Sequence, residues 1–394
     1  MKTFDAIVIG GGVIGTSIAY HLARLGLRNV ALVERDQIGN GTTAQSSCIL
    51  RTHYSVPQNV ALAKRSWDIF RDFAGYLDDT EASCGLVVCG YMIVAPEGEH
   101  AGALQASLAA QRAQGIRADE IDASRAKALL PLARFDDAAV IGYEPDAGFA
   151  DAYLVTSAFA RAARRLGATV MEGVAVRGLL RDGARVSGVS TDQGDFGAGL
   201  VISAQNIWTS ELAAWTGLEL PLRRERHAVM TLACEQHYTK AMPVFKDLGS
   251  PGMLYYRSYG GTQMLVSEGG AGEAMQTIDI NQGDVPLDTV LAVGEQVAQR
   301  FPDYASAGLA ATWTGVYDVT PDWNPVLGHA PGIDGLLLAY GFSGHGFKLA
   351  PMIGKLIAQQ ALNLPTDVSL EPYALDRFQS GRMLRGRYGV GAVS

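Results

Sequence analysis

The feature that most constrains this chain is a glycine-rich turn between two apolar segments. Residues 4–9 form an apolar run typical of a buried parallel strand, and residues 13–25 carry apolar side chains at helical spacing. Between them stands the motif Gly10-Gly11-Gly12-Val13-Ile14-Gly15. In such a motif the first glycine makes the tight turn, the second admits a pyrophosphate, and the third lets the helix approach the strand. The motif therefore predicts a diphosphate at the helix N-terminus, where free N–H groups and the helix dipole favour anions.

A second apolar run, at residues 30–33, completes a βαβ unit and ends at Glu34, 19 residues after Gly15. A carboxylate at this place accepts the ribose hydroxyls of an adenine dinucleotide and repels the 2′-phosphate of NADP. A glycine-rich turn that binds no ligand is the alternative. The strand, the helix and Glu34 together argue for a dinucleotide site.

The motif alone does not separate NAD from FAD, but the residues that follow Glu34 do. Glu34-Arg35 leads into residues 39–47, a stretch of small residues and hydroxyls that reads Gly-Asn-Gly-Thr-Thr-Ala-Gln-Ser-Ser. An FAD enzyme needs such a stretch because the chain must pass along the extended diphosphate and ribityl part of a larger cofactor. The sequence therefore predicts FAD.

Three parts of the sequence resemble the D-amino-acid oxidase superfamily of flavoproteins. They are the glycine-rich N-terminus, the Glu-Arg pair with its Gly-Thr-Thr-x-x-Ser-Ser run, and residues 340–348, which read Tyr-Gly-Phe-Ser-Gly-His-Gly-Phe-Lys. Within the superfamily they are most similar to glycine oxidase and to the sarcosine oxidases, including the β-subunits of the heterotetrameric enzymes. The resemblance covers nearly the whole chain and is weakest between residues 75 and 145. It implies an α/β, Rossmann-like FAD domain of the glutathione-reductase type and an α+β substrate domain with an antiparallel sheet.

The order of elements along the chain predicts that the FAD domain is discontinuous. Elements of the nucleotide-binding type recur at residues 4–34, 152–204 and 336–357, and segments of a different character separate them. We expect the FAD-binding domain to comprise residues 1–78, 147–212 and 315–385, the substrate-binding domain residues 79–146 and 213–314, and a tail residues 386–394.

The residues expected to bind the cofactor follow from the motif and from the resemblance. They are Gly10, Gly12, Val13, Ile14, Gly15, Glu34, Arg35, Thr42, Thr43, Ser46, Ser47, Cys48, Val176, Ala204, Trp208, Gly344, His345, Gly346, Phe347 and Lys348. The Ala-Gly-x-Trp turn of the family is replaced here by Gln205-Asn206-Ile207-Trp208. Asparagine tolerates a left-handed backbone well, so we expect Asn206 to keep this turn.

The segment Gly344-His345-Gly346 precedes an amphipathic helix at residues 347–356, which predicts a second helix N-terminus that favours anions. Reduced flavin carries negative charge near N1 and O2, and a helix N-terminus there would stabilise it. The resemblance implies the same role for this loop. His345 either contributes its ring to this role or is a loop histidine on the solvent side. In the second case the backbone N–H groups alone would stabilise the reduced flavin.

The resemblance implies that Arg51 and Lys348 hold the substrate carboxylate, and the expected catalytic residues are Arg51, Tyr256, Tyr317, His345 and Lys348. An arginine fork together with a lysine is a good carboxylate anchor in a semi-buried site. The alternative is that both are ordinary surface charges. Tyr317 matches a loop that lies over the flavin in the family. Three tyrosines, at positions 255, 256 and 259, would form an aromatic wall around an amine or belong to a core.

Two departures from the family bear on the chemistry. Residues 313–317 contain no cysteine, so we expect FAD to be bound non-covalently. Residues 261–265 contain no lysine, whereas the oxidases keep one on this strand to promote reaction with O₂. This second departure favours a quinone or a partner protein as the electron acceptor.

Composition excludes several other classes of function. The chain has 394 residues and a formal net charge of −8, which gives no electrostatic footprint for nucleic acid or an anionic membrane surface. The four cysteines have neither CxxC spacing nor interleaved histidines, so we expect reduced thiols and no metal site. No apolar run is long enough to span a bilayer and no signal peptide precedes the first strand, which together favour a cytoplasmic enzyme.

The sequence thus predicts an FAD-dependent oxidoreductase that converts a small amino acid or N-alkyl amino acid to an imine by hydride transfer to the flavin. Three alternatives stay open. The chain would be a subunit of a multi-flavin amine dehydrogenase complex whose partner accepts electrons, or an FAD-dependent 2-hydroxy-acid dehydrogenase. The third alternative is a non-catalytic FAD-binding protein, which is the least favoured because Arg51 and Lys348 would then have no function.

Overall fold

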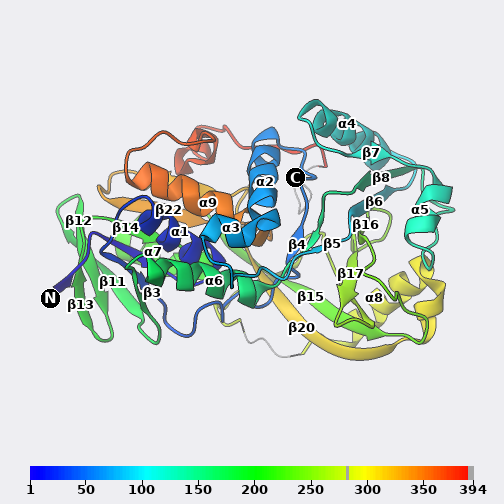
Figure 1. Cartoon of the computed structure of the whole chain (residues 1–394), viewed down its shortest axis with the longest axis horizontal. Coiled ribbons are helices and arrows are strands. Elements are labelled where there is room, and N and C mark those ends of the chain that lie inside the picture. Colours follow the sequence, from blue (N-terminus) through cyan, green and yellow to red (C-terminus); the bar gives the residue numbers. More distant parts are fainter. Residues whose placement is uncertain (281–283, 389–394) are drawn as a thin grey trace.

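The computed structural model describes residues 1–280 and 284–388, which form two adjoining halves (Figure 1). In one half, helices surround a mostly parallel sheet, which we call the central sheet. The other half is built on a longer, mostly antiparallel sheet, which we call the large sheet. The predicted class, α/β with a second half of α+β character, is confirmed.

The central sheet has the strand order β10-β3-β2-β14-β22-β21. These strands are β10 (Thr169–Met171), β3 (Val30–Val33), β2 (Ala6–Ile9), β14 (Val201–Ser203), β22 (Leu336–Tyr340) and β21 (Val326–His329). All neighbouring strands are parallel except β21, which is antiparallel to β22. The strands are mostly apolar because both faces of the sheet are covered.

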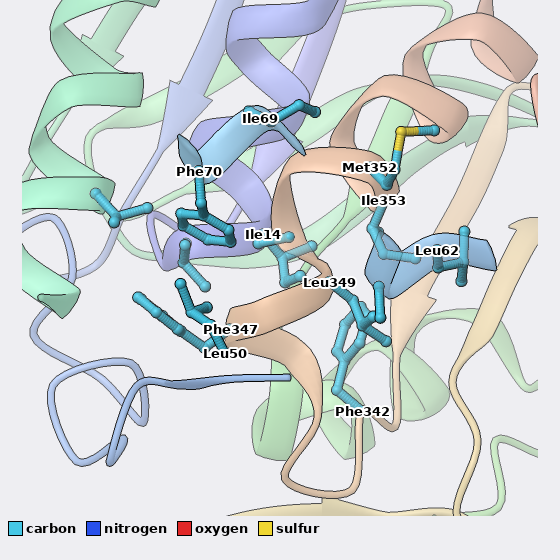
Figure 2. Packing of buried hydrophobic residues seen from close by; sticks show 14 of the residues in the cluster. Ile14, Leu50, Leu62, Ile69, Phe70, Phe342, Phe347, Leu349, Met352 and Ile353 are labelled. Carbon is cyan, nitrogen blue, oxygen red and sulfur yellow. The ribbon is translucent and has the colours of Figure 1, made fainter. Parts of the chain in front are cut away.

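Alternate residues of each central strand enter two different cores. On one face lie the helices α1 (Val13–Arg24), α6 (Ala152–Arg165), α9 (Gly346–Ala361), α2 (Pro57–Arg71) and α3 (Phe73–Leu77). Figure 2 shows part of this core, where Phe347 at the start of α9 packs near Leu50 and stacks on Phe70, with 5.9 Å between the ring centroids. The other face packs on α7 (Thr209–Thr216) and on a smaller sheet of β1 (Lys2–Thr3), β13 (Gly194–Gly197), β12 (Arg185–Thr191) and β11 (Val176–Asp182).

The large sheet has the order β19-β15-β18-β17-β16-β6-β8-β7, and β20 pairs with β15. The strands are β19 (Glu273–Met275), β15 (Arg223–Ala233), β18 (Gln263–Ser267), β17 (Tyr255–Tyr259), β16 (Val244–Asp247), β6 (Tyr91–Ala95), β8 (Val140–Glu144), β7 (Asp119–Glu120) and β20 (Gly308–Val319). The sheet is antiparallel except where β16 runs parallel to β6. One face packs on α5 (Ala123–Leu129) and α8 (Leu287–Arg300), and α4 (Glu99–Ala113) covers part of the other. The strands β4 (Ile49–Leu50), β9 (Gly148–Phe149) and β5 (Val87–Val88) form a small separate sheet.

The strands of the central sheet come from the three segments expected for the FAD domain. The expected boundaries do not all fall between elements. β20 runs across the boundary at residues 314 and 315 because its pairing with β15 continues to Val319, and α7 runs across the boundary at residues 212 and 213. The domain limits therefore stay a prediction. Of the expected tail at 386–394, residues 389–394 lie outside the described residues. Within the described part of the chain, no helix is long and apolar enough to cross a membrane.

Candidate functional site

The glycine turn between β2 and α1 is held by backbone contacts that leave no room for side chains. Gly10 has a φ of +103°, and a Cβ atom there would lie 2.5 Å from the carbonyl oxygen of Ala204. A Cβ atom at Gly15 would collide with the carbonyl group of Gly10, so the helix can approach the strand only if residue 15 is glycine. A Cβ atom at Gly12 would meet only Thr43 Oγ1, at 3.1 Å. Gly12 therefore borders open space, into which a diphosphate would fit.

A groove, which we call the dinucleotide groove, runs along the carboxyl ends of the central strands. Of the expected cofactor residues, those that line it are Gly10, Gly12, Val13, Ile14, Glu34, Arg35, Thr42, Thr43, Val176, Ala204 and Trp208. Asn206 also lines it and has the left-handed backbone expected of it, with a φ of +51°. Sequence reasoning missed Val174, which lacks a signal of its own because only the fold brings it to this edge. Gln205, the first residue of the turn that contains Asn206, lines the groove as well.

Glu34 is fixed at the end of β3 by two backbone donors. Gly11 N–H donates to Glu34 Oε2 at 2.6 Å, and Asp36 N–H donates to Glu34 Oε1 at 2.9 Å. Each carboxylate oxygen has a second acceptor site, so both still have capacity for a ribose hydroxyl. Arg35 lies at the rim, where it pairs with Glu211 at 2.8 Å and lies over the Trp208 ring, with 5.0 Å to the centroid.

The dinucleotide groove continues into a second hollow, which we call the central cavity, between the central sheet and the large sheet. Val13, Ile14, Thr42, Thr43 and Phe342 line both spaces, so one elongated ligand can extend from one to the other. Of the expected residues, the cavity is lined by Val13, Ile14, Thr42, Thr43, Ser46, Ser47, Arg51, Tyr317, Gly344, Gly346, Phe347 and Lys348.

The N-terminus of α9 forms one wall of this cavity. The loop before it is tight, since Gly344 has a φ of +81° and a Cβ atom there would lie 2.5 Å from the Tyr317 ring. Asp318 Oδ2 anchors the loop by accepting Gly341 N–H at 2.6 Å. Gly346, Phe347 and Lys348 occupy the first turn, whose N–H groups lack partners within a helix. This wall therefore favours negative charge.

Arg51 and Lys348 are buried in the cavity, which excludes ordinary surface charges. The guanidinium of Arg51 donates to the carbonyl oxygen of His53 and lies over the Tyr54 ring, 4.5 Å from its centroid. Burial, and then the nearby Arg51 charge, hold the pKa of Lys348 well below its usual value. An anion that entered this cavity would offset both effects.

Apart from Gly15, which packs against the turn, three expected site residues line neither the dinucleotide groove nor the central cavity. Tyr256 is completely buried on the other face of the large sheet, where it packs against Phe245 and Phe301, and its neighbour Tyr255 lines the cavity instead. Successive strand residues point to opposite faces, so a shift of one residue separates a cavity position from a core position. Cys48 is buried in the helix-side core next to the cavity wall.

His345 is the third such residue, and its burial excludes the solvent-side alternative. Its ring is buried, and Nδ1 lies 3.1 Å from the Tyr54 hydroxyl oxygen. Burial, and then the charges of Lys348 and Arg51, hold its pKa well below the usual value. His345 is therefore not a solvent-side histidine, and at this point the cavity is lined by Gly344 and Gly346 on either side of it.

The polar residues of the cavity lining that sequence reasoning missed include His227, Lys246 and Asp318. His227 stacks on Tyr317 with 4.0 Å between ring centroids, and burial lowers its pKa to about 4. Tyr317 itself belongs to strand β20 and not to a loop, because pairing with β15 extends past it. The alternation of Phe245, Lys246 and Asp247 would have revealed the inward lysine only if β16 had been recognised as a strand.

These observations define a class of protein. The site has a glycine turn at a helix N-terminus, a fixed carboxylate suited to ribose, and a groove that continues into a cavity favouring anions. Together these features fit the adenine, diphosphate and ring portions of FAD. No cluster of histidine, cysteine, aspartate and glutamate suited to a metal ion is found within residues 1–280 and 284–388. The class is that of the FAD-dependent oxidoreductases.

Comparison with known proteins identifies the family. The sequence matches the family model described as FAD dependent oxidoreductase (DAO) over residues 5–360. The chain belongs to this family, and its cofactor is FAD.

Individual relatives are similar over nearly the whole chain. It is 27% identical to the sarcosine oxidase subunit beta of an Arthrobacter species, covering 100% of this chain and 95% of that protein. It is 30% identical to the 4-methylaminobutanoate oxidase (formaldehyde-forming) of Paenarthrobacter nicotinovorans over 91% of this chain, but it spans only 43% of that longer protein. Among solved structures, the L-proline dehydrogenase from P. horikoshii superposes with a TM-score of 0.88 at 26% identity, covering 97% of this chain and 99% of that one.

Proposed function

We propose that this chain oxidises the C–N bond of a small amino acid or N-alkyl amino acid to an imine, which water then hydrolyses. The observation on which the proposal depends is that Arg51 and Lys348 are both buried in the cavity that the N-terminus of α9 borders. The names of the relatives, which include a sarcosine oxidase subunit and an L-proline dehydrogenase, support the same substrate class.

The chemistry that FAD supplies is acceptance of a hydride from the carbon next to the substrate nitrogen. The residues of the cavity bind and orient the substrate. Arg51 and Lys348 hold the carboxylate by charge-assisted hydrogen bonds, which fixes the position of the neighbouring carbon. The stacked rings of Tyr317 and His227 line the cavity and limit the space open to water.

The positive charge of the cavity has a second effect on an amine substrate. Hydride can leave the carbon only when the nitrogen is neutral, and a bound ammonium close to Arg51 and Lys348 is destabilised by their charges. The site therefore lowers the pKa of the bound amine and favours its reactive form. No residue that takes up a proton in the transition state is required for this step.

A second candidate keeps the same chemistry but places it in a complex. The relative that aligns over 95% of its length is named a subunit, which supports a multi-subunit amine dehydrogenase whose partner accepts electrons. Isolation of the chain at native expression level with a stoichiometric partner would favour this arrangement over a self-sufficient enzyme.

The proposal is tested by mixing the purified yellow protein anaerobically with amino acids, N-methylamino acids and 2-hydroxy acids while the flavin absorbance is recorded. We expect bleaching by amino or N-methylamino acids, with release of ammonia or methylamine. Bleaching by 2-hydroxy acids alone would refute amine oxidation and indicate a hydroxy-acid dehydrogenase.

A further inference from the structure

The strand β16 sends one cation into the central cavity and a carboxylate away from it. Lys246 lines the cavity, whereas Phe245 on one side of it and Asp247 on the other face the opposite side of the large sheet. Asp247 is held there by Arg300, with Arg300 Nε donating to Oδ2 at 2.9 Å. The hydrogen bonds of Asp247 therefore go to Arg300, and Asp247 acts on Lys246 only through a longer-range charge interaction.

The ammonium group of Lys246 is enclosed. The residue is 4% exposed, and Nζ donates to the carbonyl oxygen of Met253 at 2.5 Å. A Cβ atom at Gly269 would collide with Nζ, so a glycine there makes room for the group. Burial, and then the charge of Arg51, lower the pKa of Lys246 to about 7. A buried cation that interacts with another cation in a cavity is stabilised by an anion placed near both.

The charges that line the cavity are unbalanced. Its cations are Arg51, Lys246 and Lys348, and Asp318 is the one acid in the lining contributed by the described residues. Asp318 is engaged with the loop before α9 through Gly341 N–H. The α-carboxylate of a substrate would bind Arg51 and Lys348. Lys246 lines the same cavity from the large sheet and would not be needed for that carboxylate.

We propose that the substrate carries a second anionic group, a carboxylate on its side chain or on its N-substituent, and that Lys246 binds this group. The substrate class is then an acidic amino acid or an N-carboxyalkyl amino acid rather than a simple N-methylamino acid. The inference rests on the proposed function, because it assumes that Arg51 and Lys348 hold the α-carboxylate.

The first test measures binding without turnover. Succinate and propionate are titrated into the FAD-loaded protein in slightly acidic buffer, where Lys246 is protonated, and Kd is read from the shift in flavin absorbance and from the thermal midpoint. We expect succinate to bind about 10- to 150-fold more tightly than propionate, which is the effect of one additional charge-assisted hydrogen bond. In Lys246→Met this ratio should fall to near one, while the Kd of propionate stays unchanged.

The variant should fold because it replaces a buried ammonium by an apolar chain of similar length. Lys240→Met, at an exposed lysine, is the matched control and should leave the ratio as it is. Equal affinity for both acids in the unaltered protein, or a ratio that survives in Lys246→Met, would overturn the proposal.

The second test measures flavin reduction by N-methylglycine, N-methylaspartate and N-(carboxymethyl)glycine. We expect the diacids to be favoured in kcat/KM and the preference to vanish in Lys246→Met. Reduction by N-methylglycine with no preference for diacids would overturn this inference and leave the proposed function intact. If no amine reduces the flavin but succinate still binds through Lys246, the proposed oxidation fails and the second anion site stands. A variant that changes only reoxidation by O₂ would assign Lys246 to oxygen chemistry and overturn the inference.

Discussion

Replacing Lys348 by methionine removes one half of the proposed carboxylate anchor and keeps the length of the side chain. Lys348 lies in the first turn of α9, is 9% exposed, and lines the central cavity with Arg51. Burial and the Arg51 charge lower its pKa, so the cavity destabilises the ammonium group relative to water. A bound carboxylate would stabilise the ammonium group, so the loss in the variant should appear in substrate affinity and not in folding.

The magnitude follows from the kind of contact that is lost. A hydrogen bond between charged groups contributes roughly 1.5–3 kcal/mol, which corresponds to about a 10- to 150-fold decrease in kcat/KM. Two unit charges ~4 Å apart at an effective dielectric of ~20 interact by about 4 kcal/mol, which sets an upper bound. We use the smaller range because the variant loses one charge-assisted hydrogen bond while Arg51 still binds the carboxylate.

The assay is anaerobic flavin reduction at a series of substrate concentrations, together with Kd for a non-reactive carboxylate. Lys355→Met is the control, because Lys355 lies on the same helix but pairs with Asp367 near the surface. It should lose at most about 1 kcal/mol of stability and no activity. Unchanged Kd and kcat/KM in Lys348→Met, with the same result in Arg51→Met, would refute the anchor.

Three further predictions concern the cofactor and the electron acceptor. Acid precipitation should leave all the FAD in the supernatant, since no cysteine lies between Trp313 and Tyr317, and a yellow pellet would contradict this. Gly12→Val should yield folded protein without FAD. Gly15→Val should lose both FAD and thermal stability, because the valine side chain collides with the preceding turn. Full flavin content in either variant would show that the site is misassigned. Reoxidation by O₂ after anaerobic reduction should be slow relative to reoxidation by a quinone, because residues 261–265 offer no lysine to promote the reaction with O₂. Reoxidation as fast as turnover, with stoichiometric peroxide, would contradict this prediction.

Local backbone physics made several parts of this protein predictable from the sequence. The turn at Gly10–Gly15 and the left-handed Asn206 are fixed by which residues tolerate a given φ or a close backbone contact. The helix at Val13–Arg24 follows from apolar spacing. The dinucleotide groove could therefore be predicted from the sequence, because a short stretch of chain builds most of it.

The central cavity depended on pairings between distant segments, and there the tertiary structure decided. Which of Tyr255 and Tyr256 faces the cavity is set by the register of β17 against β16 and β18, and a shift of one residue reverses it. The direction of the His345 ring is set by Tyr54, almost 300 residues away in the chain. Lys246 becomes a cavity cation only because β16 pairs with β17 and β6, which places its odd and even residues on different faces. Sequence thus determined the cofactor site through local steric rules, and family motifs pointed to Arg51 and Lys348. Long-range strand register decided that Lys246 and Tyr255 line the same cavity, because it sets which face of the sheet each residue occupies.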